Sequence, residues 1–285
     1  MRAQERGTTD IGSLETAAVL FHPERERAVD AAGWISQQLR ENGVDVYSGP
    51  AFDQPTISRE VLGRQLVLGL GGDGTILSLA RDTAGTGIPI LGINLGRVGF
   101  LAELTPELVL EALPRILAGE YWIETRIAVE ARWKEGNSER VHLAVNEVAL
   151  ARGASTRAIR VAVSIDREHY LTHTADGVII STATGSTAYS LAAGGPIIYP
   201  ESHDLLVTPV APHLHIGRSM IVPGTSVVEL ELWGDREAML AIDGQTECPF
   251  QIGDKVEIRR SAKRCRFVRL GPQNYFYAVL ADRLQ

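Results

Sequence analysis

Gln65-Leu66-Val67-Leu68-Gly69-Leu70-Gly71-Gly72-Asp73-Gly74-Thr75 is the stretch that decides the fold. Its apolar run is typical of a strand buried on both faces of a parallel sheet. The glycines that follow let the backbone turn sharply into a helical stretch. Ligands of such sheets gather at the carboxyl ends of the strands, where helix N-termini favour phosphate groups. The stretch therefore predicts an α/β domain with an anion site after this strand.

The flanking sequence extends the α/β pattern from Ala17 to about Arg126. Apolar strands are expected at 17–21 and 88–93. A helix should start at Pro23, a residue that suits the first helical position, and a second should run from Thr105-Pro106 to Gly119. Strands that alternate with helices indicate a Rossmann-like parallel sheet that is covered on both faces.

The sequence after Arg126 has a different pattern, because its apolar runs are short, partly alternating and separated by turn residues. The expected strands cover residues 127–131, 141–150, 159–165, 178–181, 227–232, 239–242 and 255–259. This half should be β-rich and mostly antiparallel. We therefore predict an α/β domain over residues 1–126 and a β-rich domain over residues 127–266.

Composition narrows the class of protein. The 285 residues carry a formal charge of −7, which argues against nucleic acid or an anionic membrane as a partner. The two cysteines form no CxxC pair and fit a reducing compartment. No apolar run approaches the roughly 20 residues that span a bilayer, and the N-terminus lacks the apolar core of a signal peptide. We expect a cytoplasmic protein.

Asp73 points to phosphoryl transfer. A carboxylate that faces a pyrophosphate at about 4 Å costs about 4 kcal/mol at an effective dielectric of 20. It makes sense where a divalent cation intervenes, or where the acid accepts a proton from an attacking hydroxyl. Two other interpretations stay open at this point. Asp73 could simply cap the helix, and residues 69–74 also match the G-x-G-x-x-G pattern of dehydrogenases, although Asn94 stands where the next strand should end in an acid.

Residues 176–196 form the second informative stretch, Asp-Gly-Val-Ile-Ile-Ser-Thr-Ala-Thr-Gly-Ser-Thr-Ala-Tyr-Ser-Leu-Ala-Ala-Gly-Gly-Pro. A strand runs into a loop of small and hydroxyl-bearing residues, which permits close approach of a flat ligand, and Tyr189 offers a stacking face. By composition alone, a tight corner of the β domain is an equal alternative.

Together these stretches resemble the NAD kinase family from Ala17 to the C-terminus. The acidic glycine loop is shared with diacylglycerol, sphingosine and phosphofructo-kinases. The more specific marks are residues 92–101, the pair Asn146-Glu147, and residues 176–195. The resemblance implies an NAD site between an α/β domain and a β-rich domain, and a C-terminal segment, residues 267–285, that returns to the first domain.

The resemblance also implies roles for single residues. Asp73 is similar to the acid proposed to accept the proton of the ribose 2′-hydroxyl, and Gly74 lies beside it at NAD. Asn146 and Glu147 match the pair that holds the dinucleotide. The wall around its bases and riboses, with further contacts, would comprise Arg157, Thr174, Asp176, Thr187, Ala188, Tyr189, Ser190, Leu191, Ala192 and Gln245.

The implied reaction moves the terminal phosphoryl group of ATP, or of another donor, to the adenosine 2′-hydroxyl of NAD. The sequence shows no dedicated metal cage, so we expect Mg²⁺ to arrive with the nucleotide. The family analogy also implies a homo-oligomer, either a dimer or a tetramer. Ala183 and Ala192 replace a usual proline and serine, and Thr174 stands where relatives often carry a basic residue. These departures concern donor preference and affinity.

Two other functions stay open. A lipid kinase of the same superfamily would share the Asp73 loop, but it has no reason to carry Asn146-Glu147 and needs an apolar acceptor cleft. A non-catalytic NAD(P) sensor would bind the dinucleotide without needing a carboxylate at position 73.

Overall fold

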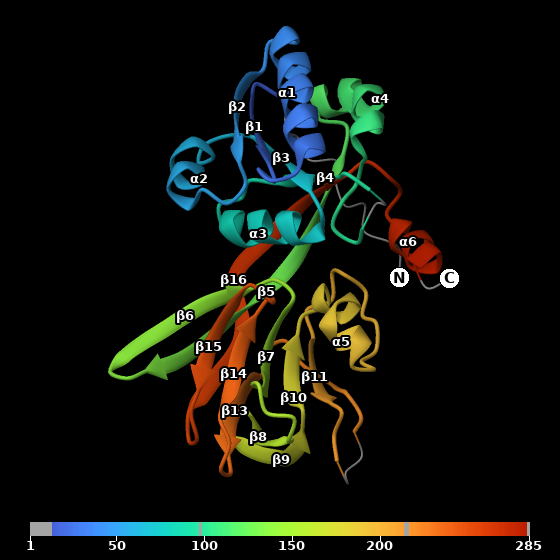
Figure 1. The fold of residues 1–285 in the computed structure, drawn as a ribbon. Helices are drawn as coiled ribbons and strands as arrows, with labels where there is room; N and C mark the ends of the chain where they lie inside the picture. Colours follow the sequence, from blue (N-terminus) through green and yellow to red (C-terminus); the bar gives the residue numbers. More distant parts are fainter. Residues whose placement is uncertain (1–12, 97–98, 214–216, 284–285) are drawn as a thin grey trace. The chain divides into compact units, whose positions relative to one another are not determined.

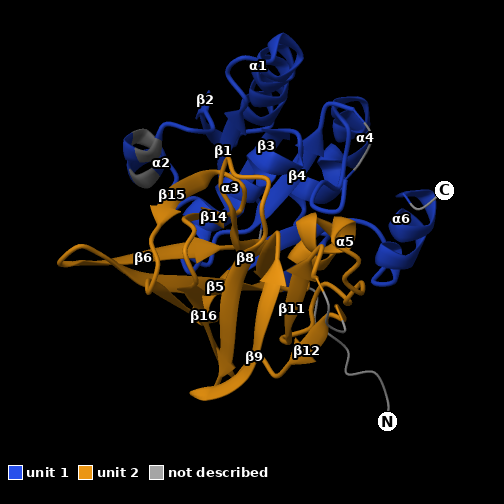
Figure 2. Ribbon diagram, turned by 60° about the horizontal axis from the view of Figure 1, so that its bottom comes forward, with its two compact units in different colours: residues 1–125, 265–285 blue, residues 126–264 orange. Residues whose placement is uncertain are grey.

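The computed structural model describes residues 13–96, 99–213 and 217–283. The chain divides into two compact units (Figures 1 and 2). Unit 1 comprises residues 1–125 and 265–285, and unit 2 comprises residues 126–264. Strands β5 (Trp122–Glu135) and β16 (Lys255–Arg269) carry the chain from one unit to the other.

Unit 1 is built on a parallel sheet in the order β2-β1-β3-β4, to which the end of β16 adds through Phe267 beside Ile90. Its strands are β1 (Thr16–Phe21), β2 (Asp45–Pro50), β3 (Leu66–Gly71) and β4 (Ile90–Asn94). Its helices are α1 (Glu26–Glu41), α2 (Gln54–Glu60), α3 (Asp73–Thr83), α4 (Pro106–Leu117) and α6 (Tyr275–Arg283).

Helices cover both faces of this sheet, as the continuous apolar strands predict. Leu66, Leu68 and Leu70 of β3 lie in one cluster with the buried sides of α1 and α4. The intervening positions face α3, because a Cβ at Gly69 would lie 2.7 Å from Leu79 of that helix. The predicted α/β fold of this half is confirmed.

The start of the first helix differs from the prediction. Pro23 and Glu24 lie in a turn, and α1 begins at Glu26. The backbone N–H of Arg25 donates to the carbonyl of His22 at 3.2 Å, which closes the turn. A proline suits a turn as well as a first helical position, since both need a φ near −65°.

Unit 2 is a β-sandwich, and its mostly antiparallel pairing is as predicted. One sheet joins β16, β13, β8 and β9, with β5 paired to β16 and β6 paired to β5. The other sheet has the order β12-β11-β10-β7-β14-β15. The remaining strands are β6 (Ser138–Ala144), β7 (Glu147–Arg152), β8 (Ile159–Ile165), β9 (Glu168–Ala175), β10 (Gly177–Ser181), β11 (Leu205–Val210), β12 (Met220–Val222), β13 (Val227–Trp233), β14 (Ala238–Ile242) and β15 (Thr246–Phe250). The short helices η1 (Gly185–Thr187) and α5 (Tyr189–Ala192) follow β10.

The prediction of one strand over residues 141–150 is wrong. The chain forms β6, which pairs with β5, and then β7, which pairs with β10 and β14 in the other sheet. The break falls at Val145-Asn146, where backbone N–H groups donate to the carboxylate of Asp243 instead of to a neighbouring strand. The two residues therefore mark the point where the chain changes sheets.

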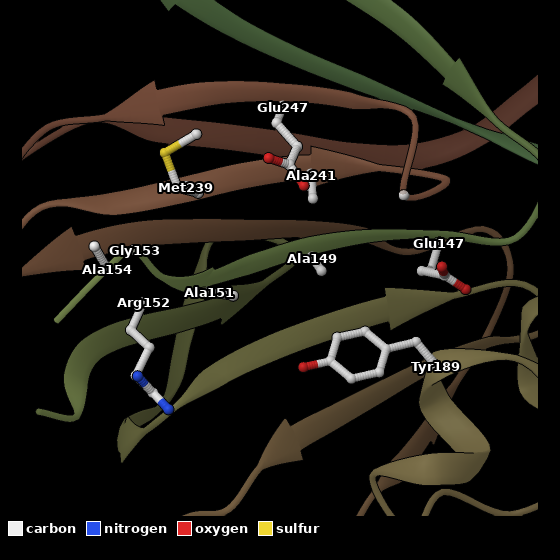
Figure 3. A pocket seen from close by; sticks show the side chains of 11 residues that line it. Glu147, Ala149, Ala151, Arg152, Gly153, Ala154, Tyr189, Met239, Ala241 and Glu247 are labelled. Atoms are coloured by element: carbon white, nitrogen blue, oxygen red, sulfur yellow. The ribbon is translucent and has the colours of Figure 1, made fainter. Parts of the chain in front are cut away.

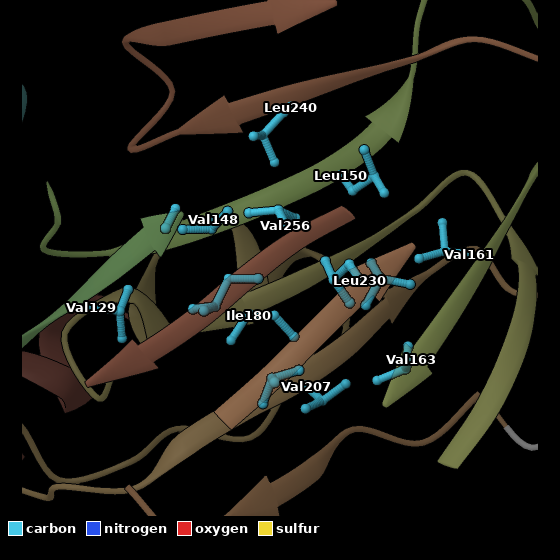
Figure 4. Close-up of a cluster of buried hydrophobic side chains, with 14 of the residues drawn as sticks. Val129, Val148, Leu150, Val161, Val163, Ile180, Val207, Leu230, Leu240 and Val256 are labelled. Carbon is cyan, nitrogen blue, oxygen red and sulfur yellow. The ribbon is translucent and has the colours of Figure 1, made fainter. Parts of the chain in front are cut away.

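The interior of the sandwich follows from strand alternation. Val148 and Leu150 of β7 and Leu240 of β14 point between the sheets and pack against Leu230 and Val256 of the facing sheet (Figure 4). Residues 147, 149 and 151 of β7 and residues 239 and 241 of β14 must then face the other way.

Within the described residues, none of the helices has both the length and the apolar character that a bilayer crossing requires.

Candidate functional site

Asp73 is the first residue of α3 and directly follows the turn from β3. Gly72 is the N-cap residue, in an extended conformation, and no side chain caps the helix. The interpretation of Asp73 as the helix cap is therefore wrong. A carboxylate in the first turn of a helix lies near the partial positive charge of the N-terminus. Gly74 beside it is exposed.

Gly99 covers the half-buried carboxylate of Asp73. A Cβ at position 99 would overlap both carboxylate oxygens, so any other residue there would displace the Asp73 side chain. Both residues belong to unit 1. The loop after β4 thus contacts the Asp73 carboxylate, a contact that the sequence does not single out for Gly99.

Asp243 of unit 2 fixes the Asn146-Glu147 pair. Its Oδ1 accepts backbone N–H bonds from Asn146 at 2.8 Å and from Glu147 at 3.2 Å, and its Oδ2 accepts one from Val145 at 3.0 Å. Asp243 itself sits in a tight turn with Gly244, where both residues have positive φ. The hairpin between β14 and β15 therefore sets the backbone at the start of β7.

The backbone carbonyl of Asn146 is also fixed by its neighbours. Its oxygen accepts the Thr182 N–H at 2.9 Å, and the Thr182 hydroxyl donates to the Val145 carbonyl at 2.6 Å. A Cβ at Gly185 would overlap the Asn146 carbonyl. The loop after β10 and the start of β7 thus fit together only because residue 185 has no side chain.

A cavity of about 540 Å³ lies on the face of β7 and β14 that points away from the core (Figure 3). Its floor consists largely of small side chains, which leave the space that larger residues would fill. Tyr189 of α5 stands at its side, with its hydroxyl toward the Arg152 end. The lining residues are Glu147, Ala149, Ala151, Arg152, Gly153, Ala154, Tyr189, Met239, Ala241, Gly244 and Glu247.

Glu147 gives this cavity an unusual acid. Burial, and secondly the nearby charge of Asp243, raise the pKa of Glu147 to about 7. Its side chain is 7% exposed, and its Oε2 has no hydrogen-bond partner among the described residues. A protonated Glu147 can donate a hydrogen bond, whereas an ionised one can only accept.

Asp176 joins the cavity through Arg152. Arg152 Nε lies 2.9 Å from Asp176 Oδ1, and the N–H of Arg152 donates to the carbonyl of Asp176 at 2.8 Å. Because Arg152 lines the cavity, this ion pair places a fixed charge pattern at one end of it. The structure thus brings Glu147, Tyr189 and, through Arg152, Asp176 to one place.

The other expected contacts do not line this cavity. Ser190 is buried and its hydroxyl lies 2.9 Å from that of Thr208, so that hydroxyl supports the fold. The Thr187 hydroxyl donates to the carbonyl of Thr184 at 3.1 Å. Thr174 lies on β9 and is half-buried, as are Ala188 and Leu191. The exposed residues of this set are Arg157, Ala192 and Gln245.

Sequence reasoning missed Arg152, Asp243 and the small residues of the cavity floor. Asp243-Gly244 carries a visible signal, since Asp-Gly between two apolar runs is typical of a hairpin turn. Ala149 and Ala241 carry none, because alanine at an outward strand position is unremarkable until the neighbouring strand is known.

A glycine turn from a parallel strand into a helix N-terminus is a common phosphate-binding arrangement, and a cavity of this size is typical of small-molecule sites. Together they indicate an enzyme that binds phosphorylated small molecules. Two family models match the chain, the ATP-NAD kinase N-terminal domain over residues 56–121 and the ATP-NAD kinase C-terminal domain over residues 145–270. An NAD kinase of Dehalococcoides mccartyi is 40% identical over 269 residues, which cover 94% of this chain and 95% of the relative. An NAD kinase of Chloroflexus aurantiacus is 40% identical over 276 residues, which cover 95% and 99%.

Solved structures agree with this assignment. An NAD kinase from Archaeoglobus fulgidus in complex with ATP is 26% identical, with a TM-score of 0.75 and coverage of 93% of this chain and 97% of that one. Yeast NADH kinase complexed with NADH has the same fold, with a TM-score of 0.83, 24% identity and coverage of 95% and 88%. The chain belongs to the NAD kinase family.

The raised pKa of Glu147 predicts a pH-dependent stability. Between its ordinary pKa of 4.5 and the raised pKa of about 7, the folded protein binds the Glu147 proton more tightly than the unfolded chain does. The free energy of unfolding therefore falls as pH rises through this range, by up to about 3 kcal/mol at about 1.4 kcal/mol per pKa unit. Glu147→Gln, which stays neutral, should melt at a higher temperature than wild type at pH 8.5 and show little difference at pH 5.

Glu247→Gln is the matched control, because Glu247 lines the same cavity but is exposed. Its melting temperature should follow that of wild type at every pH. A Glu147→Gln difference of the same size at pH 5 and at pH 8.5 would contradict the assignment of the raised pKa to this residue.

Proposed function

We propose that this NAD kinase family member transfers the terminal phosphoryl group of ATP to the 2′-hydroxyl of the adenosine ribose of NAD. A bond forms between the 2′-oxygen and the γ-phosphorus, and the bond from that phosphorus to the β,γ-bridging oxygen breaks. The products are NADP and ADP, and the proton of the hydroxyl passes to the protein. The observation that carries the proposal is the Asp73 carboxylate, held at the first turn of α3 after a parallel strand.

Asp73 is proposed as the acceptor of that proton. Phosphoryl transfer relies mostly on positioning and on neutralisation of charge, so a single well-placed base is what the protein must add. The Gly71-Gly72 turn allows a ribose to approach the carboxylate, and Gly99 backs it from the protein side. Gly74 follows Asp73 on the exposed side and is proposed to contact NAD.

Unit 2 is proposed to supply the dinucleotide site. A cavity of about 540 Å³ is within the range for small-molecule sites, and its apolar alanine floor suits a flat ring. Tyr189 offers a ring face, Glu147 offers a polar contact, and Asp176 is held by Arg152. Asn146, which precedes Glu147 but does not line the cavity, is proposed as a further contact to the dinucleotide. That the Archaeoglobus relative is in complex with ATP and the yeast kinase with NADH supports nucleotides as the substrates.

The remaining expected contacts stay part of the proposal. The loop after β10 can offer the backbone of residues 187–192 and the side chain of Leu191, whereas the Ser190 hydroxyl is engaged with Thr208. Three further residues are proposed to contact the nucleotides from outside the cavity, namely Arg157, Thr174 and Gln245. The homo-oligomeric state is also a proposal, which sedimentation of the purified protein would test.

Mg²⁺ is proposed to enter with ATP. The ion commonly binds through one or two carboxylates together with substrate phosphates, and the Gly71–Thr75 loop presents one carboxylate, that of Asp73. The residues present therefore fit an ion that is held chiefly by the nucleotide. When bound, Mg²⁺ would neutralise charge on the phosphates.

Asp73→Asn should lower kcat by about 10²–10⁴, the usual contribution of a general base, with little change in the KM for NAD. The side chain keeps its size and loses its basicity and charge. Initial rates of NADP formation with ATP and Mg²⁺ measure the effect. Glu24→Gln is the control, since Glu24 is an exposed carboxylate at the same edge of the sheet, after β1. Near-normal turnover of Asp73→Asn would remove Asp73 from the proton-acceptor role.

Ala241→Leu should raise the KM for NAD by about tenfold or more while the KM for ATP stays within about twofold. The larger side chain fills cavity space and removes no polar group, and misfit of this kind costs about 1–3 kcal/mol. Met239→Leu conserves the volume of a neighbouring lining residue and should leave both KM values unchanged. A selective rise in the KM for ATP would assign the cavity to the donor instead.

A further inference from the structure

Arg269, at the end of β16, is a buried cation in unit 1. Its side chain is 0% exposed. Burial of a charge is costly unless the charge is paired and hydrogen-bonded. Nη2 lies 2.8 Å and Nε 3.0 Å from Glu124 Oε2, and Nη1 lies 3.2 Å from Glu103 Oε2. Glu124 and Glu103 are themselves 1% and 9% exposed. The guanidinium is thus the centre of a buried ionic cluster.

The same guanidinium holds a loop. Three consecutive carbonyls accept its N–H groups, each at 3.3 Å, and they belong to Phe100, Leu101 and Ala102. The guanidinium makes six contacts with five N–H donors, so the two N–H groups of Nη1 are shared among Leu101, Ala102 and Glu103. A lysine ammonium has only three donors and cannot serve two carboxylates and three carbonyls. The backbone of this loop is therefore shaped by one side chain from the C-terminal segment.

The other side of the loop rests on β4. The N–H of Glu103 donates to the carbonyl of Gly92 at 2.8 Å, and the N–H of Asn94 donates to the carbonyl of Leu104 at 2.8 Å. A Cβ at Gly92 would lie 3.0 Å from the carbonyl oxygen of Leu101. Residues 100–104 thus contact β4 on one side and the Arg269 guanidinium on the other.

This loop carries Gly99, whose backbone lies against the Asp73 carboxylate. A continuous path of contacts therefore runs from Arg269 through the carbonyls of residues 100–102 to Gly99 and Asp73. The C-terminal segment is anchored to the cluster as well. Glu103 Oε1 accepts the N–H groups of Leu270 at 2.7 Å and Gly271 at 2.8 Å, and the Tyr275 hydroxyl donates to Glu124 at 2.8 Å.

We infer that Arg269 is a positioning residue for the phosphoryl transfer, which acts by fixing the loop that orients Asp73. The inference rests on the proposed role of Asp73 as proton acceptor. A base contributes only while its oxygen stays within about 2.6–3.2 Å of the proton that it accepts. If the loop moves, Asp73 loses its backing and its orientation, whereas the nucleotide contacts of unit 2 are unaffected.

Arg269→Lys tests the inference in the full-length enzyme. Lysine keeps the charge beside Glu124 and Glu103 but cannot reach three carbonyls. We expect kcat to fall about tenfold, with the KM values for NAD and ATP within about twofold of wild type. Trp122→Phe is the matched control. It removes the 2.8 Å bond from Trp122 Nε1 to the Gly271 carbonyl in the same segment, away from residues 99–102, and should leave kcat within about twofold.

A double mutant separates positioning from general support of the fold. In the Asp73→Asn background, Arg269→Lys should lower the residual kcat by less than about twofold, because the group that Arg269 positions is already gone. An unreduced tenfold loss in that background would overturn the inference, as would an equal loss in Trp122→Phe. Normal turnover of Asp73→Asn alone would instead contradict the proposed role of Asp73.

Glu103→Gln provides a second route if Arg269→Lys does not fold, because it weakens the same cluster from the loop itself. Its kcat should fall with unchanged KM values, and the loss should again disappear in the Asp73→Asn background. A Glu103→Gln loss that persists undiminished in that background would also overturn the inference.

Discussion

The architecture of the proposed dinucleotide site depends on the alternation of side chains along β7 and β14. Even-numbered residues of both strands, such as Val148 and Leu240, fill the interior of the sandwich. The odd-numbered residues must then face outward. On that outer face the small side chains of Ala149, Ala151 and Ala241 leave a cavity, and Glu147 adds a carboxyl group to its lining. A slip of one residue in register would place Glu147 in the core and bulky aliphatic side chains in the cavity. One packing requirement therefore sets both the stability of unit 2 and the shape of its site.

Asp243 protects this register. Its carboxylate accepts the backbone N–H groups of residues 145–147, where β6 ends and β7 starts. Asp243 therefore defines the break between the sheets, and its charge adds to the burial that raises the pKa of Glu147. Unit 1 uses a comparable device, since the Arg269 guanidinium orders the loop that backs Asp73. In both units a buried charged side chain forms hydrogen bonds with backbone groups. These bonds fix residues 145–147 in unit 2 and residues 100–102 in unit 1, which belong to or adjoin the proposed site.

The sequence predicts those parts that are determined locally. The run from Leu66 to Leu70 predicts a buried strand because its residues are continuously apolar. The loops at Asp73 and Asp176 could be singled out because their informative residues are consecutive in the sequence. The break at Asn146 could not be predicted, because its cause, Asp243, lies 97 residues further along the chain. Arg269 carries no local signal either, since a basic residue at a strand end normally faces solvent and its two carboxylate partners come from distant segments. Contacts between polar groups that are far apart in the sequence cannot be predicted from local sequence patterns.

Asp73 is proposed to accept the proton of the adenosine 2′-hydroxyl, and an NAD analogue that lacks this hydroxyl tests that role. Incubation with ATP and Mg²⁺ should show that the analogue competes with NAD, because the cavity of unit 2 is proposed to contact other parts of the molecule. The analogue should accept no phosphate. An analogue that lacks only the 2′-hydroxyl of the nicotinamide ribose should still be phosphorylated. Phosphorylation of the first analogue at a rate comparable to that of NAD would contradict the role of Asp73 at the adenosine 2′-hydroxyl. NAD would then have to bind in the opposite orientation.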